Sequence, residues 1–487
     1  MYQVPQHMDK NKIFIVQRSE VEGRLEPEFY RPSIASLEKT IREKSTRKLR
    51  DYAISLAGGA TPKKTEGDKY YADKETGIPF LRVQNLNTDG SLSLDDCLYI
   101  NKETHEGMLS RSQVSEGDLL VKITGVGRMA IASVAPEGFV GNTNQHMVVI
   151  KTGNAETSKY LARYLNLDII EKIASRHSTG GTRPALDYPS VKNIPIIEGI
   201  DFSPIDRAIE LKEQKESEAQ LLLDSIDAYI LNELGITLPE IKTDLKSRMF
   251  YIPFNELTGR RLDSKKYSLN VKQLFAAIEK SCYPIFPLKH YIKGCCSGEW
   301  GIDSDTDEIP NGYVKCLTLR ATEIDNNYNL NINENKAKCR LIKKDKFDKI
   351  KPNPLDIIIE KSGGSDDWPV GRVSIIEDET FNGLPLSFSN FLMKIQIKDI
   401  NPEYLYYFLK TMYNIGVTGS MQSQTNGIKN LIIKEYFEQA IVVPPLAKQQ
   451  EIANHIYGIR QQAKQLQEEG KTILENTKKE VEQMIIG

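Results

Sequence analysis

The chain has 487 residues, of which 40% are hydrophobic and 27% charged, a composition typical of an ordinary globular protein with roughly two to four domains. Its 64 basic and 66 acidic residues give a net charge of −2, which excludes a uniformly basic nucleic-acid-binding chain but leaves room for a local basic surface. The six cysteines form no C-x-x-C pair, and no run of about 20 apolar residues is present. We therefore expect reduced thiols, no metal site, no membrane segment and a cytoplasmic location.

The first half of the chain predicts an α+β domain. VEGRLEPEFYRP (21–32) leads into a helix through Leu37 and Ile41, and the glycines and proline of GGATPKK (58–64) indicate a polar loop. Short strand-like runs separated by turns follow at 78–86, 98–100, 117–125, 128–134 and 145–153. A single helix is expected over 159–175, then a basic glycine-rich loop, RHSTGGTRP (176–184), and a strand at 191–197.

A long charged helix is predicted over 203–234. Ser203 and Pro204 fit an N-cap followed by proline at the first helical position, and Gly235 fits a C-cap. Its apolar residues follow a 4–3 spacing typical of a coiled-coil seam, which needs a partner helix. These residues are Ile205, Ile209, Ala219, Leu223, Ile226 and Ile230. Lys212 and Glu216 interrupt the seam.

The second half repeats the order of the first. GRRLDSKKY matches GRLEPEFY, with Arg261 at the place of Arg24, and PLDIIIEKSGG (354–364) matches GDLLVKITG (117–125). The final helix carries a second 4–3 series that extends to Met484, and Lys212 and Glu216 stand where this series has Ile459 and Ala463. Its members are Ile452, Ile456, Ile459, Ala463, Leu466 and Ile473. The ordered matches predict a tandem duplication, although no clear copy of GGATP precedes the second domain's strands, where IKGCCSGEW (292–300) stands instead.

The predicted architecture has two similar α+β domains in tandem, each followed by a long helix, with the helices paired as an antiparallel coiled coil around a pseudo-two-fold axis. The expected boundaries are 1–200 for the first domain, 201–240 for the central helix, 241–445 for the second domain and 446–487 for the distal helix. A helix over 203–234 spans roughly 45–50 Å at a rise of about 1.5 Å per residue. Such a pair is a rigid spacer between two like domains.

These features together resemble the specificity subunit of Type I restriction-modification systems. The resemblance covers the chain from about Arg24 onward and is carried by the duplicated motifs above, by TGGTRPALDYPSVKNIPI and by IVVPPLAKQQEIANHI (441–456). The first helix departs from the family pattern, because PIIEGIDFSPIDRAI lacks the Pro-Pro-Leu-x-x-Gln entry.

The resemblance implies two target-recognition domains that read the halves of a bipartite double-stranded DNA sequence. It implies two modification (methyltransferase) subunits and restriction or translocase subunits as partners, which would hold S-adenosylmethionine, ATP and Mg²⁺. No catalytic residue or cofactor is then expected in this chain, and the residues agree, since no P-loop or methylase N-P-P-aromatic motif is present. SGGSDDWPVGR (362–372) lacks the Gly-Lys-Ser/Thr ending of a phosphate loop and is interpreted as a turn between strands.

Candidate DNA contacts are polar or basic residues on glycine-flanked loops, because such side chains reach base edges and phosphates. In the first domain they are Lys63, Lys64, Arg176, Ser178, Thr179, Thr182 and Arg183. In the second they are Lys361, Ser362, Gln422, Gln424, Asn426 and Lys429. For each one, a solvated surface loop is the alternative. Two other functions stay open at this point: a coiled-coil scaffold without sequence-specific DNA binding, and a self-sufficient restriction or modification enzyme.

Overall fold

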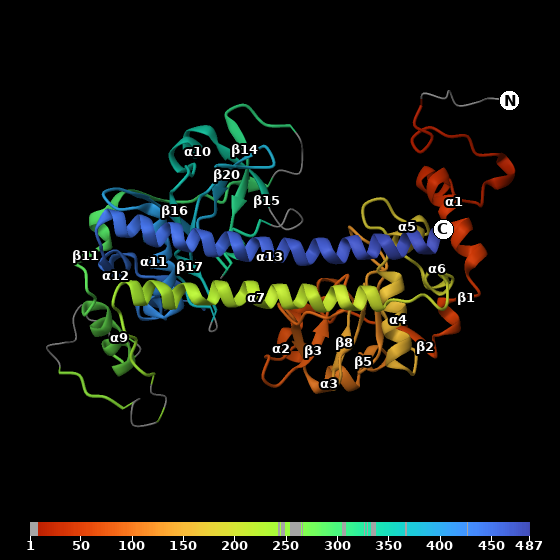
Figure 1. Ribbon diagram of the computed structural model, residues 1–487, viewed down its shortest axis with the longest axis horizontal. Coiled ribbons are helices and arrows are strands. Elements are labelled where there is room, and N and C mark those ends of the chain that lie inside the picture. Colours follow the sequence, from red (N-terminus) through yellow and green to blue (C-terminus); the bar gives the residue numbers. More distant parts are fainter. Residues whose placement is uncertain are drawn as a thin grey trace. The chain divides into compact units, whose positions relative to one another are not determined.

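The computed structural model describes residues 8–487 except 242–243, 245–248, 254–263, 265, 304–307, 326, 329, 333–337, 366–367 and 426. The described chain forms two compact units. The first contains residues 1–215 and 468–487, and the second contains residues 216–467. Each unit therefore includes one segment of the central helix and one of the distal helix, and each is described below by itself. Their elements can be followed in Figure 1 by label and colour.

The first unit is built on two four-stranded sheets, ordered β2-β9-β6-β7 and β4-β3-β8-β5, with the short pair β1-β10 beside them. The strands are β1 (Arg47–Lys48), β2 (Ser55–Gly58), β3 (Ile78–Leu81), β4 (Leu98–Ile100), β5 (Gln113–Ser115), β6 (Leu119–Lys122), β7 (Ala132–Val134), β8 (Val140–Thr143), β9 (Met147–Lys151) and β10 (Pro195–Ile196). The helices are α1 (Pro32–Lys44), α2 (Gly67–Tyr70), α3 (Lys102–Glu106), α4 (Ala155–Leu165), α5 (Asp168–Arg176), α6 (Tyr188–Lys192) and the start of α7 (Ser203–Glu233).

The sheet β2-β9-β6-β7 is buried on both faces. Along β6, Leu119 and Val121 belong to the core shared with the helices, whereas Leu120 belongs to the core shared with the other sheet. Because successive side chains of a strand point to opposite faces, this alternation places the sheet between two apolar layers. The sequence of β6 up to Val121 is therefore a continuous run of apolar residues rather than an alternation of apolar and polar ones.

The helix predicted over 159–175 is two helices, α4 and α5, and the prediction of a single helix was wrong. Leu167 between them has an extended backbone conformation, with φ −72° and ψ 144°. The buried Asn166 side chain accepts a hydrogen bond from the Ala132 N–H (3.1 Å) and donates one to the Ala132 carbonyl (2.7 Å). These bonds tie the break to β7, and the apolar periodicity alone could not reveal it.

The second unit repeats the first. Its main sheet has the order β12-β21-β16-β18, and a second sheet has the order β13-β15-β14-β20-β19. The strands are β11 (Ile285–Pro287), β12 (Ile292–Ser297), β13 (Ile302–Asp303), β14 (Tyr313–Leu319), β15 (Lys338–Lys343), β16 (Ile357–Glu360), β17 (Ser362–Gly363), β18 (Val373–Ile375), β19 (Thr380–Phe381), β20 (Leu384–Phe388), β21 (Leu392–Ile397), β22 (Gln422–Thr425), β23 (Ile428–Leu431) and β24 (Ala440–Val442). The helices are α9 (Leu269–Glu279), α10 (Lys344–Ile350), α11 (Pro402–Asn414), α12 (Ile433–Phe437) and the start of α13 (Leu446–Ile486).

The predicted duplication is confirmed by strand pairing. The antiparallel pair β1-β10 has its counterpart in β11-β24, and the parallel pair β3-β8 has its counterpart in β14-β20. The helix α4 packs against β7 just as α11 packs against β18. The residues Arg24 and Arg261 carried this match in the sequence, and Arg261 lies outside the described residues.

The segment IKGCCSGEW, which stands in the place of GGATPKK, contains a counterpart of Gly59 in Gly298. A Cβ atom on Gly59 would lie 1.7 Å from the Thr143 carbonyl oxygen, and one on Gly298 would lie 2.1 Å from the Phe388 carbonyl oxygen. Each glycine follows the strand that pairs with β9 or β21 at the equivalent position. The close approach of two backbones requires glycine at both places, whereas the flanking residues are free to differ.

The central helix α7 has 31 residues and ends one residue before the predicted limit at Leu234. Its first N–H group, that of Ser203, donates to the Asp201 carboxylate at 2.9 Å, so Asp201 rather than Ser203 supplies the capping oxygen. At the other end Gly235 has φ +67°, and the Ile236 N–H reaches back to the Leu231 carbonyl at 2.8 Å. This is the glycine-dependent C-terminal cap that the sequence predicted.

The buried residues of α7 follow the predicted seven-residue spacing, whereas those of α13 depart from it near the C-terminus. The six seam residues predicted in α7 are all at most 6% exposed. In α13, Leu474 and Ile485 are at most 7% exposed and lie one residue beyond the predicted Ile473 and Met484, while Met484 is 78% exposed. Placing Met484 on the seam was therefore wrong, because a strict seven-residue repeat drifts by about 20° per repeat around a straight helix.

Lys212 interrupts the apolar stripe because α13 has a glycine beside it. A Cβ on Gly470 would lie 3.2 Å from the Lys212 Cα, so the missing side chain lets the two backbones approach closely. The Lys212 ammonium group reaches Asp89 at 3.2 Å, within the same unit. The lysine thus connects the helix to the domain.

Candidate nucleic-acid interface

A three-stranded sheet in the second unit collects most of the polar residues singled out in that domain. Its order is β17-β23-β22, which pairs Ser362 with Asn430 and Gln424 with Lys429. The Ser362 hydroxyl donates to the Asn430 side chain at 2.8 Å. Lys361 directly precedes β17 and donates to the Ser297 hydroxyl at 3.0 Å. Asn426 lies outside the described residues.

The other two candidates hold a neighbouring loop in place. The Lys429 ammonium group donates to the Ser365 carbonyl at 2.6 Å, and the Gln422 side-chain oxygen accepts from the Val370 N–H at 3.3 Å. Ser365 and Val370 of the segment 362–372, interpreted from sequence as a turn between strands, thus contact the hairpin formed by β22 and β23. Lys361, Ser362, Gln422, Gln424 and Lys429 are brought together, although the sequence separates them by about sixty residues.

The first unit builds the same arrangement from a looser hairpin. Thr124 and Thr179 both form β-bridges with Ala185. The Thr124–Ala185 bridge corresponds to the Ser362–Asn430 pair of the second unit, and the Thr179–Ala185 bridge corresponds to its Ser423–Asn430 pair. The Gly125 N–H donates to the Pro184 carbonyl at 3.0 Å. The segment 179–185 is therefore the first unit's counterpart of 423–430. Thr179, Thr182 and Arg183 are exposed on it.

The GGATPKK loop is linked to this hairpin through Gln145 and His146, two residues that the sequence analysis did not single out. The Thr61 hydroxyl is hydrogen-bonded to Gln145, whose neighbour His146 lies close to Arg183. Burial lowers the pKa of His146, and the positive charge of Arg183 lowers it further. Lys63 is exposed at the start of the short helical turn Lys64–Glu66, and the Lys64 side chain is not among those described.

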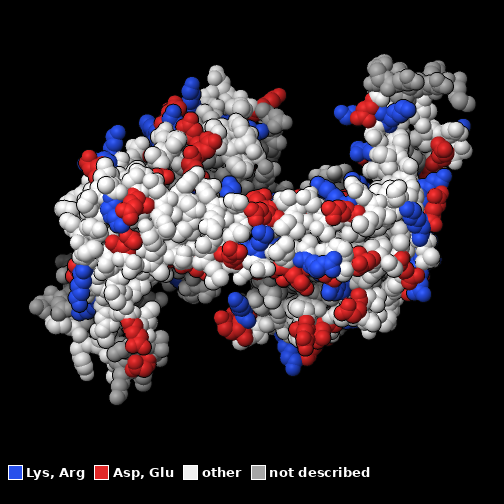
Figure 2. Space-filling model, viewed as in Figure 1, with Lys and Arg blue, Asp and Glu red and all other residues white. Residues whose placement is uncertain are grey.

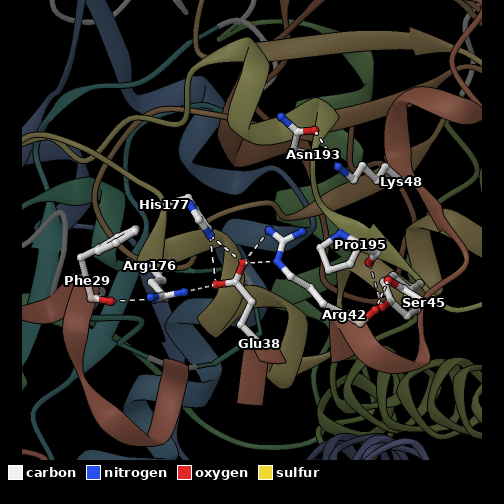
Figure 3. Close-up of polar contacts among 10 residues, drawn as sticks. Phe29, Glu38, Arg42, Ser45, Lys48, Arg176, His177, Asn193 and Pro195 are labelled. Atoms are coloured by element: carbon white, nitrogen blue, oxygen red, sulfur yellow. Dashed lines mark hydrogen bonds and ion pairs between the residues drawn. The ribbon is translucent and has the colours of Figure 1, made fainter. Parts of the chain in front are cut away.

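Arg176 is committed to the fold. Its guanidinium group is ion-paired with Glu38, donates to the Phe29 carbonyl at 2.6 Å and lies over the Phe29 ring. Figure 3 shows Glu38 receiving Arg176 and His177 on one side and Arg42 on the other. The Glu38 side chain is only 3% exposed. Burial by itself raises the pKa of Glu38, but these three partners outweigh it and bring the pKa to about 2.

Ser178 also has a structural role. Its hydroxyl donates to the Ser175 carbonyl at 2.7 Å, and its own carbonyl accepts a hydrogen bond from the Arg24 guanidinium at 2.7 Å. Arg24 thereby satisfies a carbonyl just beyond the C-terminus of α5, where a positive charge is favourable. The GRLEPEFY motif, which the sequence marked only as a repeat, anchors the base of the 179–185 hairpin.

The strand that leads into each loop ends in a buried charge, of opposite sign in the two units. Lys122, 3% exposed, donates to the Val126 carbonyl at 2.8 Å, and burial lowers its pKa. At the equivalent place Glu360, fully buried, receives both arms of Arg372 at 2.9 and 3.0 Å. The loops are thus held by different chemistry on the same backbone framework.

The residues proposed for the helical seam are buried or half-buried. All six in α7 belong to an apolar cluster, as do Ile452, Ile456 and Ala463, while Ile459, Leu466 and Ile473 pack against one. In each unit the cluster contains residues of both long helices and of the domain. The antiparallel coiled coil stays a prediction.

On the face in Figure 2, acidic and basic side chains are interspersed. Within the described ranges, no three His, Cys, Asp or Glu residues are grouped as metal ligands. None of the helices described is both long enough and apolar enough to cross a membrane.

A family model, described as the Type I restriction modification DNA specificity domain, matches residues 42–197 and 313–475. No curated protein sequence matches the chain. A solved structure titled for complex assembly and conformational transition of the type I R-M system is 14% identical, with 90% of this chain and 95% of that chain covered and a TM-score of 0.37. The S subunit from M. genitalium is 13% identical over 90% and 95%, with a TM-score of 0.33. The HsdS subunit from Thermoanaerobacter tengcongensis is 14% identical over 90% and 94%, with a TM-score of 0.26.

Proposed function

Because the chain belongs to the family of Type I restriction modification DNA specificity domains and matches it twice, we propose that its two units read the two halves of one bipartite DNA sequence. The chain is a non-catalytic DNA specificity subunit. The observation that supports bipartite reading is the duplicated loop and hairpin, 124–128 with 179–185 in the first unit and 361–372 with 422–431 in the second. Two copies of one reading surface suit two half-sites.

Seven of the sequence candidates fall into two groups. Lys63, Thr182 and Arg183 in the first unit, and Gln424 and Lys429 in the second, lie on the hairpins or on the loop beside them and would touch the DNA. Lys429 would do so while also bonding the Ser365 carbonyl, because its ammonium group has three donors. Arg176 and Ser178 would act by holding the first hairpin, because their polar groups bond within the domain. Arginine, lysine and glutamine suit base edges, and lysine and threonine suit phosphates.

The long helices would set the separation of the two half-sites and dock the partner subunits. We propose two modification subunits on this chain, with restriction or translocase subunits joining for cleavage. S-adenosylmethionine, ATP and Mg²⁺ would be bound by those partners, and the assembled complex would act on DNA in the cytoplasm. The length of α7 (31 residues) and of α13 (41 residues) supports this spacer role.

The proposal is tested by sequencing the methylated sites in cells that carry the complete system. The double variant Thr182→Ala/Arg183→Ala should relax one half-site, and Gln424→Ala/Lys429→Ala should relax the other, each leaving its companion half unchanged. If both variants methylate the wild-type sequence with wild-type selectivity, these hairpins are not the reading surfaces. If the complex binds all DNA equally at every salt concentration, the chain acts as a scaffold instead.

A further inference from the structure

The second unit's hairpin and loop present large apolar side chains to solvent among their polar residues. Trp368 is 50% exposed, Ile428 is 45% exposed and Phe391 is 44% exposed. Trp368 lies in the 361–372 loop, Ile428 begins β23, and Phe391 directly precedes β21. These three segments are bonded to one another: the Phe391 carbonyl accepts from the Lys361 N–H at 2.9 Å and from the Ser362 N–H at 3.2 Å.

The described residues of the loop around Trp368 are bonded to the hairpin and to one another. Both strands of the hairpin hold it, through the Lys429 and Gln422 side chains described above. The Ser365 N–H donates to the Trp368 carbonyl at 2.8 Å, and the Trp368 N–H donates to the Ser365 hydroxyl at 3.1 Å. The indole is thus exposed on a turn held by hydrogen bonds, although burying it would lower the free energy of the folded chain.

The first unit exposes an apolar residue on the equivalent loop. Val126, between β6 and β7, is 70% exposed, and its carbonyl is held by the buried Lys122 ammonium group. Phe391 is the second unit's counterpart of His146. The Phe391 carbonyl accepts hydrogen bonds from the two N–H groups that follow β16, and the His146 carbonyl accepts them from the two that follow β6. A single exposed apolar residue needs no explanation. Here, however, an exposed apolar residue occurs on both equivalent loops, and two more lie beside it in the second unit. This recurrence calls for an explanation.

DNA offers few apolar groups to a protein that reads base edges. In the major groove the C5-methyl group of thymine is the apolar feature among donors and acceptors, and it contacts apolar and aromatic side chains. We propose that Trp368, Phe391 and Ile428 recognise one or more thymine methyl groups in the half-site read by the second unit. This inference rests on the proposed function and names the chemistry by which that unit discriminates.

The test compares thymine with uracil, which differs only by that methyl group. The complete complex is titrated with duplexes in which each thymine of one half-site is replaced by uracil in turn. At the contacted position the replacement should weaken wild-type binding about 4-fold, the size expected for losing one buried methyl group. The same titration is repeated with the variants Trp368→Ala, Phe391→Ala and Ile428→Ala. The variant that lacks the contacting residue should bind the thymine and uracil duplexes with equal affinity.

The control variant is Ile309→Ala, whose side chain is 52% exposed in the same unit but lies outside these segments. It should keep the full thymine preference. Uracil replacements in the other half-site should respond equally in wild type and all variants. The inference is overturned if no thymine-to-uracil change affects wild-type binding, or if an affected position keeps its preference in all three variants. It is also overturned if each of the three variants weakens both duplexes by the same factor, as a minor-groove wedge would. Loss of all sequence preference in the wild type would overturn the proposed function itself.

Discussion

The buried Glu38 carboxylate offers a quantitative test of how the first hairpin is anchored. The change Glu38→Gln keeps the size of the side chain but removes the charge that receives Arg42, Arg176 and His177. Because these partners lie in α1 and at the end of α5, the substitution should loosen the contact between the two helices. The 179–185 hairpin follows α5 directly and should lose protection with it.

The magnitude follows from the lowered pKa. The pKa of Glu38 is about 2 in the folded chain and 4.5 in the reference state, so the charged form stabilises the fold by roughly 3 kcal/mol at pH 7. A lowered folded-state pKa gives stability that is fully present above the unfolded value and is lost as the pH falls toward 2. The difference between wild type and Glu38→Gln should therefore shrink to about 2 kcal/mol at pH 3.5.

Amide hydrogen exchange over peptides from α1 and α5 measures this opening free energy directly. At pH 7 the variant should exchange about 100-fold faster in these helices, which corresponds to the predicted loss. The control Glu43→Gln removes an exposed carboxylate from the same helix and should change exchange little. A Glu38→Gln effect below 1 kcal/mol, or one that does not diminish between pH 7 and pH 3.5, would refute the electrostatic explanation.

Three further predictions concern the two glycine contacts and the first hairpin. Gly470→Leu should destabilise the first unit by about 1–3 kcal/mol, because the leucine side chain would displace Lys212. Gly458→Ala, where an added Cβ has no neighbour within 4 Å, should instead stabilise the chain by up to about 1 kcal/mol. Thermal melting distinguishes the two variants, and equal effects would contradict the close packing at Gly470. Gly298→Ala should destabilise the second unit by about 3 kcal/mol, and Gly419→Ala, which meets only a distant side chain, by less than about 0.5 kcal/mol. Urea unfolding followed by tryptophan fluorescence suits this pair, since both tryptophans of the chain lie in that unit; similar midpoints would exclude the backbone clash. If the Arg183 guanidinium contacts a phosphate, Arg183→Ala should reduce the slope of log affinity against log salt by about 1, while the exposed Arg111→Ala leaves it unchanged. An unaltered slope in both variants would exclude a phosphate contact for Arg183.

The sequence predicted the repeated α+β architecture because duplication adds independent matches. The strand β4 has the predicted limits, and β3, β6, β7 and β9 lie inside their predicted runs. By contrast, β2 (SLAG) and β8 (VGNT) were missed, since each contains a glycine and has too few apolar residues to show strand periodicity. Tertiary pairing, not local propensity, makes these segments extended.

Part of the candidate surface was predictable and part was not. Glycine-flanked polar loops drew attention to both hairpins, and the structure brings the second domain's described candidates into one small sheet. The packing role of Arg176 could not be foreseen, because its partners Glu38 and Phe29 are more than 130 residues away. The signal that existed was the repeated Arg-Leu pair, whose first arginine, Arg24, bonds to the neighbouring carbonyl of Ser178.

The buried stripe of the long helices limits how they can change in length during evolution. An insertion of one residue rotates the later part of a helix by about 100° and would turn a buried position such as Leu474 toward solvent. An insertion or deletion of seven or eleven residues rotates it by only about 20°, because both lengths are close to whole numbers of turns. Functional length variants should therefore differ in α7 and α13 by such steps, which change the length of a helix by about 10 or 16 Å.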